Sequence, residues 1–324
     1  MNKYKKIGLS ALAGSLVAMS ASAEVTLSGG ASVTFTSTHD SDKTGYGMAD
    51  SITATYSGET DGGLTVTTSL ELDGGANASS SFDNRSISIA SEDMGTITFS
   101  GHGGDTVMSG WDDMMPTAYE EVFAITKNKS DAATGAGNLT IAGQSGDNTW
   151  RYDSPSVSGA SFSVAYLSTD TGTAAGRVSS YFDMGIKISP EAVEGLTVGY
   201  AVGEFDEASG TLGIDVSTMY ATYAYGSFTV GYQDSENDGP TAADSDESDS
   251  WAVSYAVSDD FSVSYGQHEY TGGTSTNPQD SSGFSASYTM GGTSIKAAFN
   301  STDNIRNVAS NDEDSFEIAI SFAF

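Results

Sequence analysis

The sequence predicts an all-β fold, a transmembrane antiparallel up-and-down β-barrel of 16 strands with a long third loop folded into the lumen. Three observations predict this fold. Apolar residues alternate with small or polar residues in 16 separate runs, the connections between the runs alternate between short and long, and no apolar run after residue 23 approaches the length of a spanning helix. A chain that crosses a membrane without helices needs a closed barrel, because lipid satisfies no backbone polar group.

Residues 1–23 have the pattern of a secretory signal peptide. Three lysines lie within the first six residues, an apolar stretch follows from Ile7 to Met19, and Ala21-Ser22-Ala23 provides a small-residue cleavage site. The apolar stretch is shorter than the about 20 residues that a spanning helix needs. We therefore expect the mature barrel to comprise residues 24–324.

The 16 runs are assigned to strands because side chains on a strand point to opposite faces with a period of two. In the last run, Phe316, Ile318, Ile320, Phe322 and Phe324 share one face, as expected where a strand faces lipid. The runs cover residues 24–38, 50–58, 63–72, 82–91, 95–102, 146–154, 160–168, 180–189, 195–204, 216–225, 227–235, 249–257, 261–270, 281–289, 293–301 and 314–324.

The connections indicate which ends of the strands lie on the same side of the membrane. The short ones are residues 59–62, 92–94, 155–159, 190–194, 226, 258–260 and 290–292. The long ones are residues 39–49, 73–81, 103–145, 169–179, 205–215, 236–248, 271–280 and 302–313. Strict alternation of this kind is typical of an up-and-down barrel with turns at one rim and loops at the other.

The composition excludes several functions. The chain has a formal net charge of −31, which opposes binding to nucleic acid, and it has no cysteine with which to form disulfides. It has three histidines, and none lies in a recognisable nucleophile or zinc motif, so we do not expect an enzyme. The inward positions carry mostly Ser, Thr, Gly and Ala, which predicts a water-filled channel.

The third loop, residues 103–145, is much longer than the other connections, and loops of that length are usually functional or disordered. It combines acidic residues with Val107, Trp111, Met114, Met115 and Val122. Those apolar side chains favour an inward course, because an outward loop would leave them in water. An inward loop would narrow the channel and line it with carboxylates.

Two segments resemble parts of the Gram-negative general porins. Residues 148–163, with the sequence NTWRYDSPSVSGASFS, resemble the strand, turn and strand that follow the constriction loop in that family. Residues 85–101, with the sequence RSISIASEDMGTITFSG, are similar to the hairpin that precedes the loop. With the signal peptide, the strand number and Phe324, the resemblance covers the whole chain and is greatest to the alphaproteobacterial branch.

The resemblance implies an outer-membrane homotrimer of 16-stranded barrels, each with its own pore for small hydrophilic solutes and ions. It also implies an eyelet in which acidic residues of the third loop face basic residues of the wall. Carried over by position, the acidic side comprises Asp105, Asp112, Asp113, Glu120 and Glu121. The inward basic or polar candidates are His102, Arg151, Lys187 and Lys296, whereas Arg85 shares parity with outward Ile87 and is expected at a rim or bulge.

This set is short of arginine, and acidic residues also crowd the outer loops, so the sequence predicts passive diffusion with mild cation preference. We expect contacts with outer-membrane lipid and lipopolysaccharide, no cofactor, and at most weak Ca²⁺ binding at acidic loops such as residues 244–249. Two alternatives remain open. A substrate-specific channel would show saturable conductance of one solute, and a secreted acidic β-rich adhesin would not need detergent for extraction.

Overall fold

The computed structural model describes residues 24–38, 43–73, 82–123, 140–168, 180–205 and 213–324. The predicted signal peptide lies outside these residues. The strands are β1 (Glu24–Thr38), β2 (Lys43–Glu59), β3 (Thr65–Asp73), β4 (Asn84–Ser91), β5 (Gly95–His102), β6 (Thr149–Asp153), β7 (Ala160–Ser168), β8 (Ser180–Ile188), β9 (Leu196–Phe205), β10 (Ile214–Tyr225), β11 (Phe228–Asp238), β12 (Asp246–Ala256), β13 (Phe261–Gly272), β14 (Gln279–Met290), β15 (Thr293–Asp303) and β16 (Glu313–Ala323). Two short 3₁₀ helices, η1 (Ser109–Trp111) and η3 (Ile305–Asn307), complete the described elements.

The 16 strands form one closed barrel in which each strand pairs antiparallel with its neighbours in the sequence. The first strand also pairs with the last, and Gly29 and Phe324 exchange backbone hydrogen bonds of 3.1 and 3.0 Å. The barrel and its strand order confirm the predicted 16-stranded antiparallel barrel. No helix in the described ranges is long and apolar enough to cross a membrane.

The prediction was wrong at the start of the second strand. β2 begins at Lys43 rather than at residue 50, so residues 39–42 replace the expected first loop of residues 39–49. The apolar alternation continues past Asp50, because Met48 lies opposite Val33 and Tyr46 lies opposite Phe35 on the outer face. Glycines at positions 45 and 47 made this part of the sequence resemble a loop.

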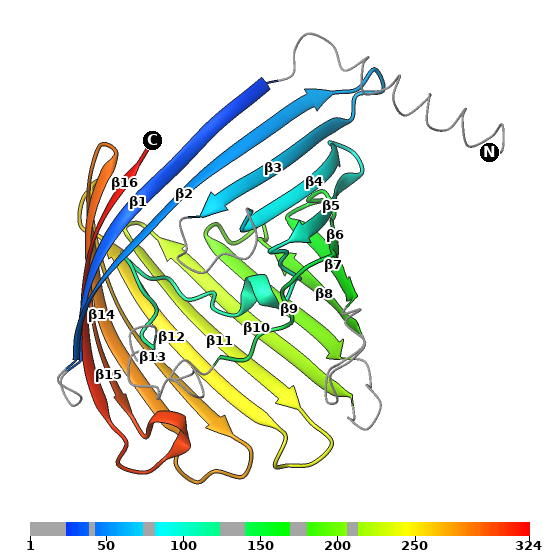
Figure 1. Ribbon diagram of the computed structural model, residues 1–324. Helices are drawn as coiled ribbons and strands as arrows, with labels where there is room; N and C mark the ends of the chain where they lie inside the picture. The colour runs from blue at the N-terminus through cyan, green and yellow to red at the C-terminus, as the bar shows by residue number, and fades with distance from the viewer. Residues whose placement is uncertain (1–23, 39–42, 74–81, 124–139, 169–179, 206–212) are drawn as a thin grey trace.

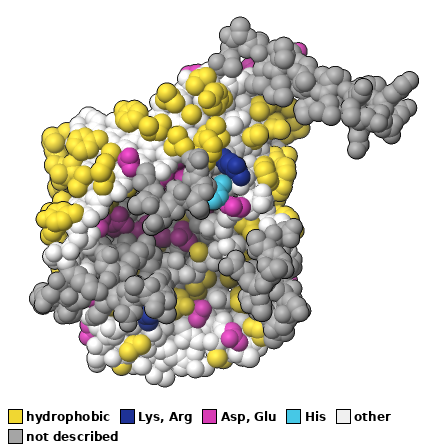
Figure 2. All heavy atoms as spheres, viewed as in Figure 1, with side chains coloured by type: hydrophobic (Ala, Val, Ile, Leu, Met, Phe, Trp, Pro, Cys, Tyr) yellow, Lys and Arg dark blue, Asp and Glu magenta, His cyan; other side chains and the backbone are white. Residues whose placement is uncertain are grey.

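The outer face of the barrel is apolar. Large side chains of the outward parity, such as Ile87, Phe162 and Phe299, are each about half exposed, and Figure 2 shows hydrophobic side chains gathered on the upper part of the surface. Aromatic side chains with polar ends hydrogen-bond beside this band, as in the 2.6 Å contact between Tyr232 Oη and Asp249 Oδ1. Such residues suit the boundary between lipid and water.

The buried apolar core lies inside the barrel. It comprises side chains of the third loop and of the inner wall, and Figure 1 shows η1 within the barrel. The third-loop side chain Trp111 packs edge-on against Tyr220 of β10, with 5.2 Å between the ring centroids. The fold thus uses its inner surface to position a loop, while its outer surface is suited to lipid.

Candidate functional site in the lumen

The third loop leaves the wall through a narrow neck. Gly104 and Gly146 form two backbone hydrogen bonds of 3.0 and 2.8 Å, which end the ladder between β5 and β6. Gly103 precedes this pair with a φ of 63°, a conformation that glycine adopts at little cost. The neck fixes both ends of the loop within one residue of the predicted bounds, 103 and 145.

From the neck, the loop first contacts β8. The backbone N–H groups of Val107 and Met108 donate to the two carboxylate oxygens of Asp183, at 3.1 and 2.8 Å. Asp183 has the inward parity and is 0% exposed. Its carboxylate therefore receives two consecutive backbone N–H groups at the turn that leads into η1.

The middle of the loop is held by β11. The N–H of Met114 donates to Gln233 Oε1 at 2.7 Å, and Gln233 Nε2 donates to the carbonyl oxygen of Trp111, also at 2.7 Å. A single amide side chain thereby satisfies one backbone donor and one backbone acceptor. The acidic pair Asp112 and Asp113 lies between these two attachment points.

The far part of the loop reaches β13–β16. Ala118 N–H donates to Ser264 Oγ at 2.9 Å, and Tyr119 N–H donates to Ser285 Oγ at 3.1 Å. The phenol of Tyr119 donates to Glu317 Oε1 at 2.6 Å, and burial followed by this hydrogen bond raises the pKa of Tyr119. The described segment of the loop thus follows the inner wall from β8 to β16.

Small wall residues make room for the loop. A Cβ at Gly185 would lie 2.8 Å from Val107 Cγ1, and one at Gly231 would lie 2.6 Å from Pro116 Cδ. Gly266 and Gly283 face Val122 at 3.2 Å in the same way. Contacts this close leave no space for a larger side chain on that part of the wall.

The predicted acidic side chains differ in exposure. Asp105 and Asp112 are exposed, whereas Asp113, Glu120 and Glu121 are partly buried. Burial, together with the nearby charges of Glu121 and Asp112, raises the pKa of Asp113 to about 7, although the Met115 N–H opposes this shift. Figure 2 shows acidic side chains gathered in the hollow of the molecule.

The predicted basic side chains do not form one cluster. Arg151 pairs with Asp153 at 3.0 Å on its own strand and donates to the carbonyl oxygen of Thr106 at 3.1 Å. Lys296 Nζ lies 5.2 Å from the centre of the Tyr119 ring. Both residues therefore meet the loop through groups other than its predicted acidic side chains.

The other two candidates lie at separate places. His102 Nδ1 lies 2.6 Å from Asp147 Oδ1 beside the neck. Lys187 is exposed near the turn end of β8, next to the last residue of that strand. Arg85 borders the β-bulge between Arg85 and Ser86, where the sequence had placed it at a rim or bulge.

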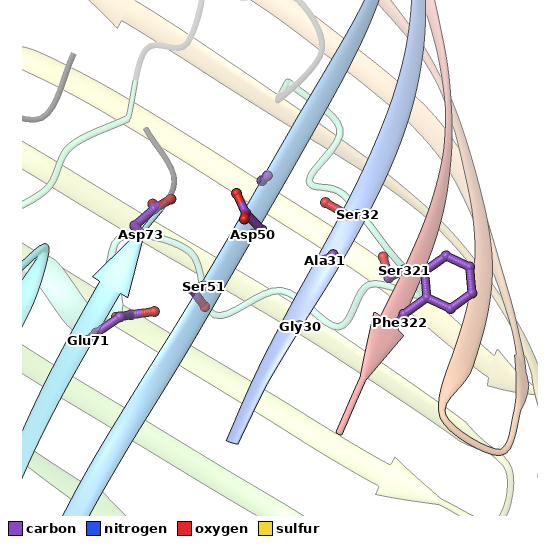
Figure 3. A pocket seen from close by; sticks show the side chains of 10 residues that line it. Gly30, Ala31, Ser32, Asp50, Ser51, Glu71, Asp73, Ser321 and Phe322 are labelled. Carbon is purple, nitrogen blue, oxygen red and sulfur yellow. The ribbon is translucent and has the colours of Figure 1, made fainter. Parts of the chain in front are cut away.

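A different part of the wall is open. A groove on the inner wall is lined by β1, β2, β3 and β16, with Gly30, Ser32 and Ser51 among its small residues. Glu71 and Asp73 of β3 border it, as Figure 3 shows. Register places both acids inward, since Glu71 lies opposite Thr53 and Asp73 lies opposite Ser51.

The sequence reasoning missed Asp183, Gln233 and Glu317 as loop supports and Glu71 and Asp73 as wall acids. All five have the inward parity, and that parity was the available signal. Parity alone does not distinguish a side chain that meets water from one that meets the loop. The distinction depends on the path of the loop around the wall.

The acidic run at residues 244–249 does not form one loop. Asp246, Glu247 and Asp249 belong to β12, where alternate residues point to opposite faces. Within the described part of the chain, no three His, Asp or Glu side chains are placed to hold a metal ion. Weak calcium binding there stays a prediction.

Several acidic residues near the rim that carries the long loops lie on the outer face of the barrel, away from the lumen. Cross-strand register pairs Asp234 with Asp249 and Glu236 with Glu247, and it continues the row through Asp249 and Glu269. These residues share the parity of the lipid-facing Tyr232 and Trp251. They add to the negative charge of the rim but do not line the channel.

A closed barrel with a polar inner wall and a loop in its lumen defines a membrane channel. The family model of the Gram-negative porins matches residues 8–324, and the chain belongs to that family. It is therefore an outer-membrane protein that forms a channel for passive diffusion. Members of this family are channels rather than enzymes.

Solved structures with the same fold include two porins of low sequence identity. The anion-selective porin from Comamonas acidovorans matches with a TM-score of 0.66 and 15% identity, covering 93% of this chain and 100% of that chain. A mutant of the Rh. blastica porin matches with a TM-score of 0.66 and 16% identity at the same coverage. No curated protein sequence matches the chain.

Proposed function

We propose that the channel is a general diffusion pore for small hydrophilic solutes that prefers cations. The open wall carries this proposal, because neither residues 24–38 nor residues 44–73 contain Lys or Arg, while Glu71 and Asp73 border the groove. The third loop supplies Asp105, Asp112, Asp113, Glu120 and Glu121 on its side of the lumen. Permeating ions would then pass between carboxylates on both sides.

The physical basis is electrostatic. A narrow passage lined by one sign of charge within low-dielectric walls raises the local concentration of the opposite ion. The effect extends over about 10 Å at 0.1 M salt, so it weakens as ionic strength rises. Arg151 offsets little of this charge, because it is paired with Asp153. Lys187 lies near the turn end of β8.

The barrel itself does not determine the sign of selectivity. The Comamonas acidovorans porin has the same fold and is named as anion-selective. Selectivity must therefore depend on which charged side chains line the passage of each chain. The preference proposed here depends on the acids of the third loop and of β3.

A substrate-specific channel is the second candidate. Such a channel usually needs a continuous track of aromatic or basic side chains along the lumen. The inward Tyr181 and Tyr220 are 0% and 1% exposed and are packed beneath the loop, so neither offers a surface to a solute. This burial favours the general pore, and the family assignment replaces the secreted-adhesin alternative.

We also propose a homotrimer that contacts outer-membrane lipid and lipopolysaccharide. Asp50 lies on the outward face of β2 between Met48 and Ile52 and opposite Ala31, and it is exposed. A carboxylate facing lipid is costly, whereas burial against another subunit allows it a hydrogen-bond partner. The outer face near β1 and β2 therefore suits contact with a second copy of the chain.

The test is reconstitution of the purified mature protein in planar bilayers with unequal KCl on the two sides. We expect current steps in groups of three and a reversal potential that favours potassium. Replacing Glu71→Gln together with Asp73→Asn should reduce this preference without closing the pore. A reversal potential that favours chloride would contradict the cation preference, and saturation by one solute would favour the substrate-specific channel.

A further inference from the structure

We propose that Asp183 is the positioning residue that fastens the third loop to the wall and thereby keeps the acidic pair Asp112 and Asp113 at a fixed place in the lumen. This inference goes beyond ion preference. It requires only that the barrel conducts ions, which is a property of the channel whatever its selectivity.

Among the described residues, Asp183 is the charged wall group that accepts hydrogen bonds from the loop backbone, whereas Glu317 accepts its hydrogen bond from the phenol of Tyr119. Gln233, Ser264, Ser285 and Asn300 are neutral, whereas Asp183 is a carboxylate with 0% exposure. It accepts the N–H of Val107 and the N–H of Met108 on separate oxygens. Charge-assisted hydrogen bonds of this kind are about twice as strong as neutral ones.

The carboxylate is stabilised by peptide N–H groups and by the neighbouring side chains of Thr106 and Tyr181 rather than by a cation. Among the described residues, no Lys or Arg forms an ion pair with Asp183, and the nearby Arg151 is directed to Asp153 and to the carbonyl oxygen of Thr106. A buried charge in this state depends on its hydrogen-bond donors, of which the two N–H groups belong to the loop. Detaching the loop would therefore leave both the carboxylate and two N–H groups to be rehydrated.

The hydrogen bonds to Asp183 hold a part of the loop on which electrostatic repulsion acts. Asp112 and Asp113 are adjacent acids, and Glu121 contributes a third negative charge that acts on Asp113. Their mutual repulsion favours a loop that moves away from the wall into the wider lumen. Asp183 holds the segment before this pair, and Gln233 binds the residues on either side of it, Trp111 and Met114.

The closest test uses Asp183→Asn, which is nearly the same size. An asparagine side chain offers one oxygen acceptor and an NH₂ donor, so it can pair with only one of the two N–H groups. The matched control is Asp147→Asn, the same change at a carboxylate beside the neck that binds His102 and is exposed. Heat-modifiable migration in gels would first show that both variants retain a closed barrel.

The readout is the accessibility of a thiol introduced as Val107→Cys, because Val107 is 0% exposed and the natural sequence has no cysteine to interfere. With Asp183 present, a charged thiol reagent should react slowly. With Asp183→Asn, the reaction should accelerate about tenfold or more, as expected from the loss of a hydrogen bond to a charged group. Asp147→Asn should leave the rate unchanged.

Single-channel records provide the second readout. The Asp183→Asn channel should visit additional conductance levels, because a released loop obstructs the lumen intermittently, and Asp183→Glu should restore part of the steady current. Unchanged thiol reactivity and unchanged current noise in a folded Asp183→Asn barrel would overturn the proposal. If Asp183→Asn does not fold, Asp183→Ser, which also lacks the carboxylate, is labelled in the same way, and a thiol there that reacts as slowly as with Asp183 present overturns the proposal.

Discussion

The inner wall has two regions that use small residues for opposite purposes. Along β8–β16, Gly185, Gly231, Gly266 and Gly283 provide space that loop side chains fill. Along β1–β3, Gly30, Ser32 and Ser51 border a groove that the loop does not line. A small inward residue therefore indicates either a protein contact or a water contact, depending on which region of the wall carries it.

The charged residues differ between the same two regions. On the covered wall, Asp183 and Glu317 serve the loop by accepting hydrogen bonds from Val107, Met108 and Tyr119. On the open wall, Glu71 and Asp73 border the groove. One region thus uses carboxylates to position the loop, and the other presents them toward the channel.

The largest effect is expected from enlarging a small residue on the covered wall. Gly185→Val places a Cβ within 3 Å of Val107 and Trp111, and overpacking of this kind typically costs 1–3 kcal/mol. Ser51→Val on the open wall is the control and should change the free energy of unfolding by less than about 0.5 kcal/mol. Urea unfolding in detergent measures both, and equal losses would remove the distinction between the regions.

A charge reversal on the open wall should change selectivity without destabilising the barrel. Glu71→Lys with Asp73→Lys should move the reversal potential in a KCl gradient toward chloride, because the groove would then carry positive charge. The control is Glu204→Lys with Asp215→Lys, a cross-strand pair on the outer face. Equal shifts in both double variants would show that overall charge, rather than the open wall, sets the preference.

A smaller effect is expected where the loop meets the last strand. Tyr119→Phe removes the hydrogen bond to Glu317 Oε1 and should lower the free energy of unfolding by about 1 kcal/mol, because the site is partly buried. Tyr223→Phe on the outer face provides a control with the same atomic change. Thermal midpoints should fall for the first variant only, and a fall of equal size in both would refute the assignment.

The smallest effect is the titration of one loop acid. The pKa of Asp113 is raised to about 7 by burial, so its negative charge is present at pH 8 and largely lost at pH 6. Cation preference should therefore decline as pH falls through 7. The folded state binds this proton more tightly than the unfolded state does. Protonation of Asp113 therefore stabilises the fold, and the free energy of unfolding should rise as pH falls from 7 toward 4. Asp113→Asn should flatten both trends.

Much of the fold was predictable from local pattern. Alternation such as that from Phe316 to Phe324 indicates directly which side of a strand faces lipid. The length of each connection indicates at which rim of the barrel it lies. The neck at Gly104 and Gly146 lay within one residue of the predicted loop bounds. The start of β2 was missed because Gly45 and Gly47 interrupt a pattern that Tyr46 and Met48 nevertheless continue.

The site was less predictable, because its contacts join residues distant in the sequence. The pairing of Arg151 with Asp153 removes an expected wall cation, and it depends on side-chain reach along one strand face. The role of Asp183 depends on a contact with Val107, 76 positions earlier in the sequence. Parity showed that these residues face inward, but only the path of the loop shows which of them it contacts.

The neck formed by Gly104 and Gly146 also bears on how this protein can be engineered. Its two backbone hydrogen bonds join the ends of the loop without using a loop side chain. The loop can then be regarded as an exchangeable segment, whose length and sequence can be changed while the strands keep their register. New recognition properties would be introduced by grafting a segment at this junction and matching its contacts to the wall from β8 to β16.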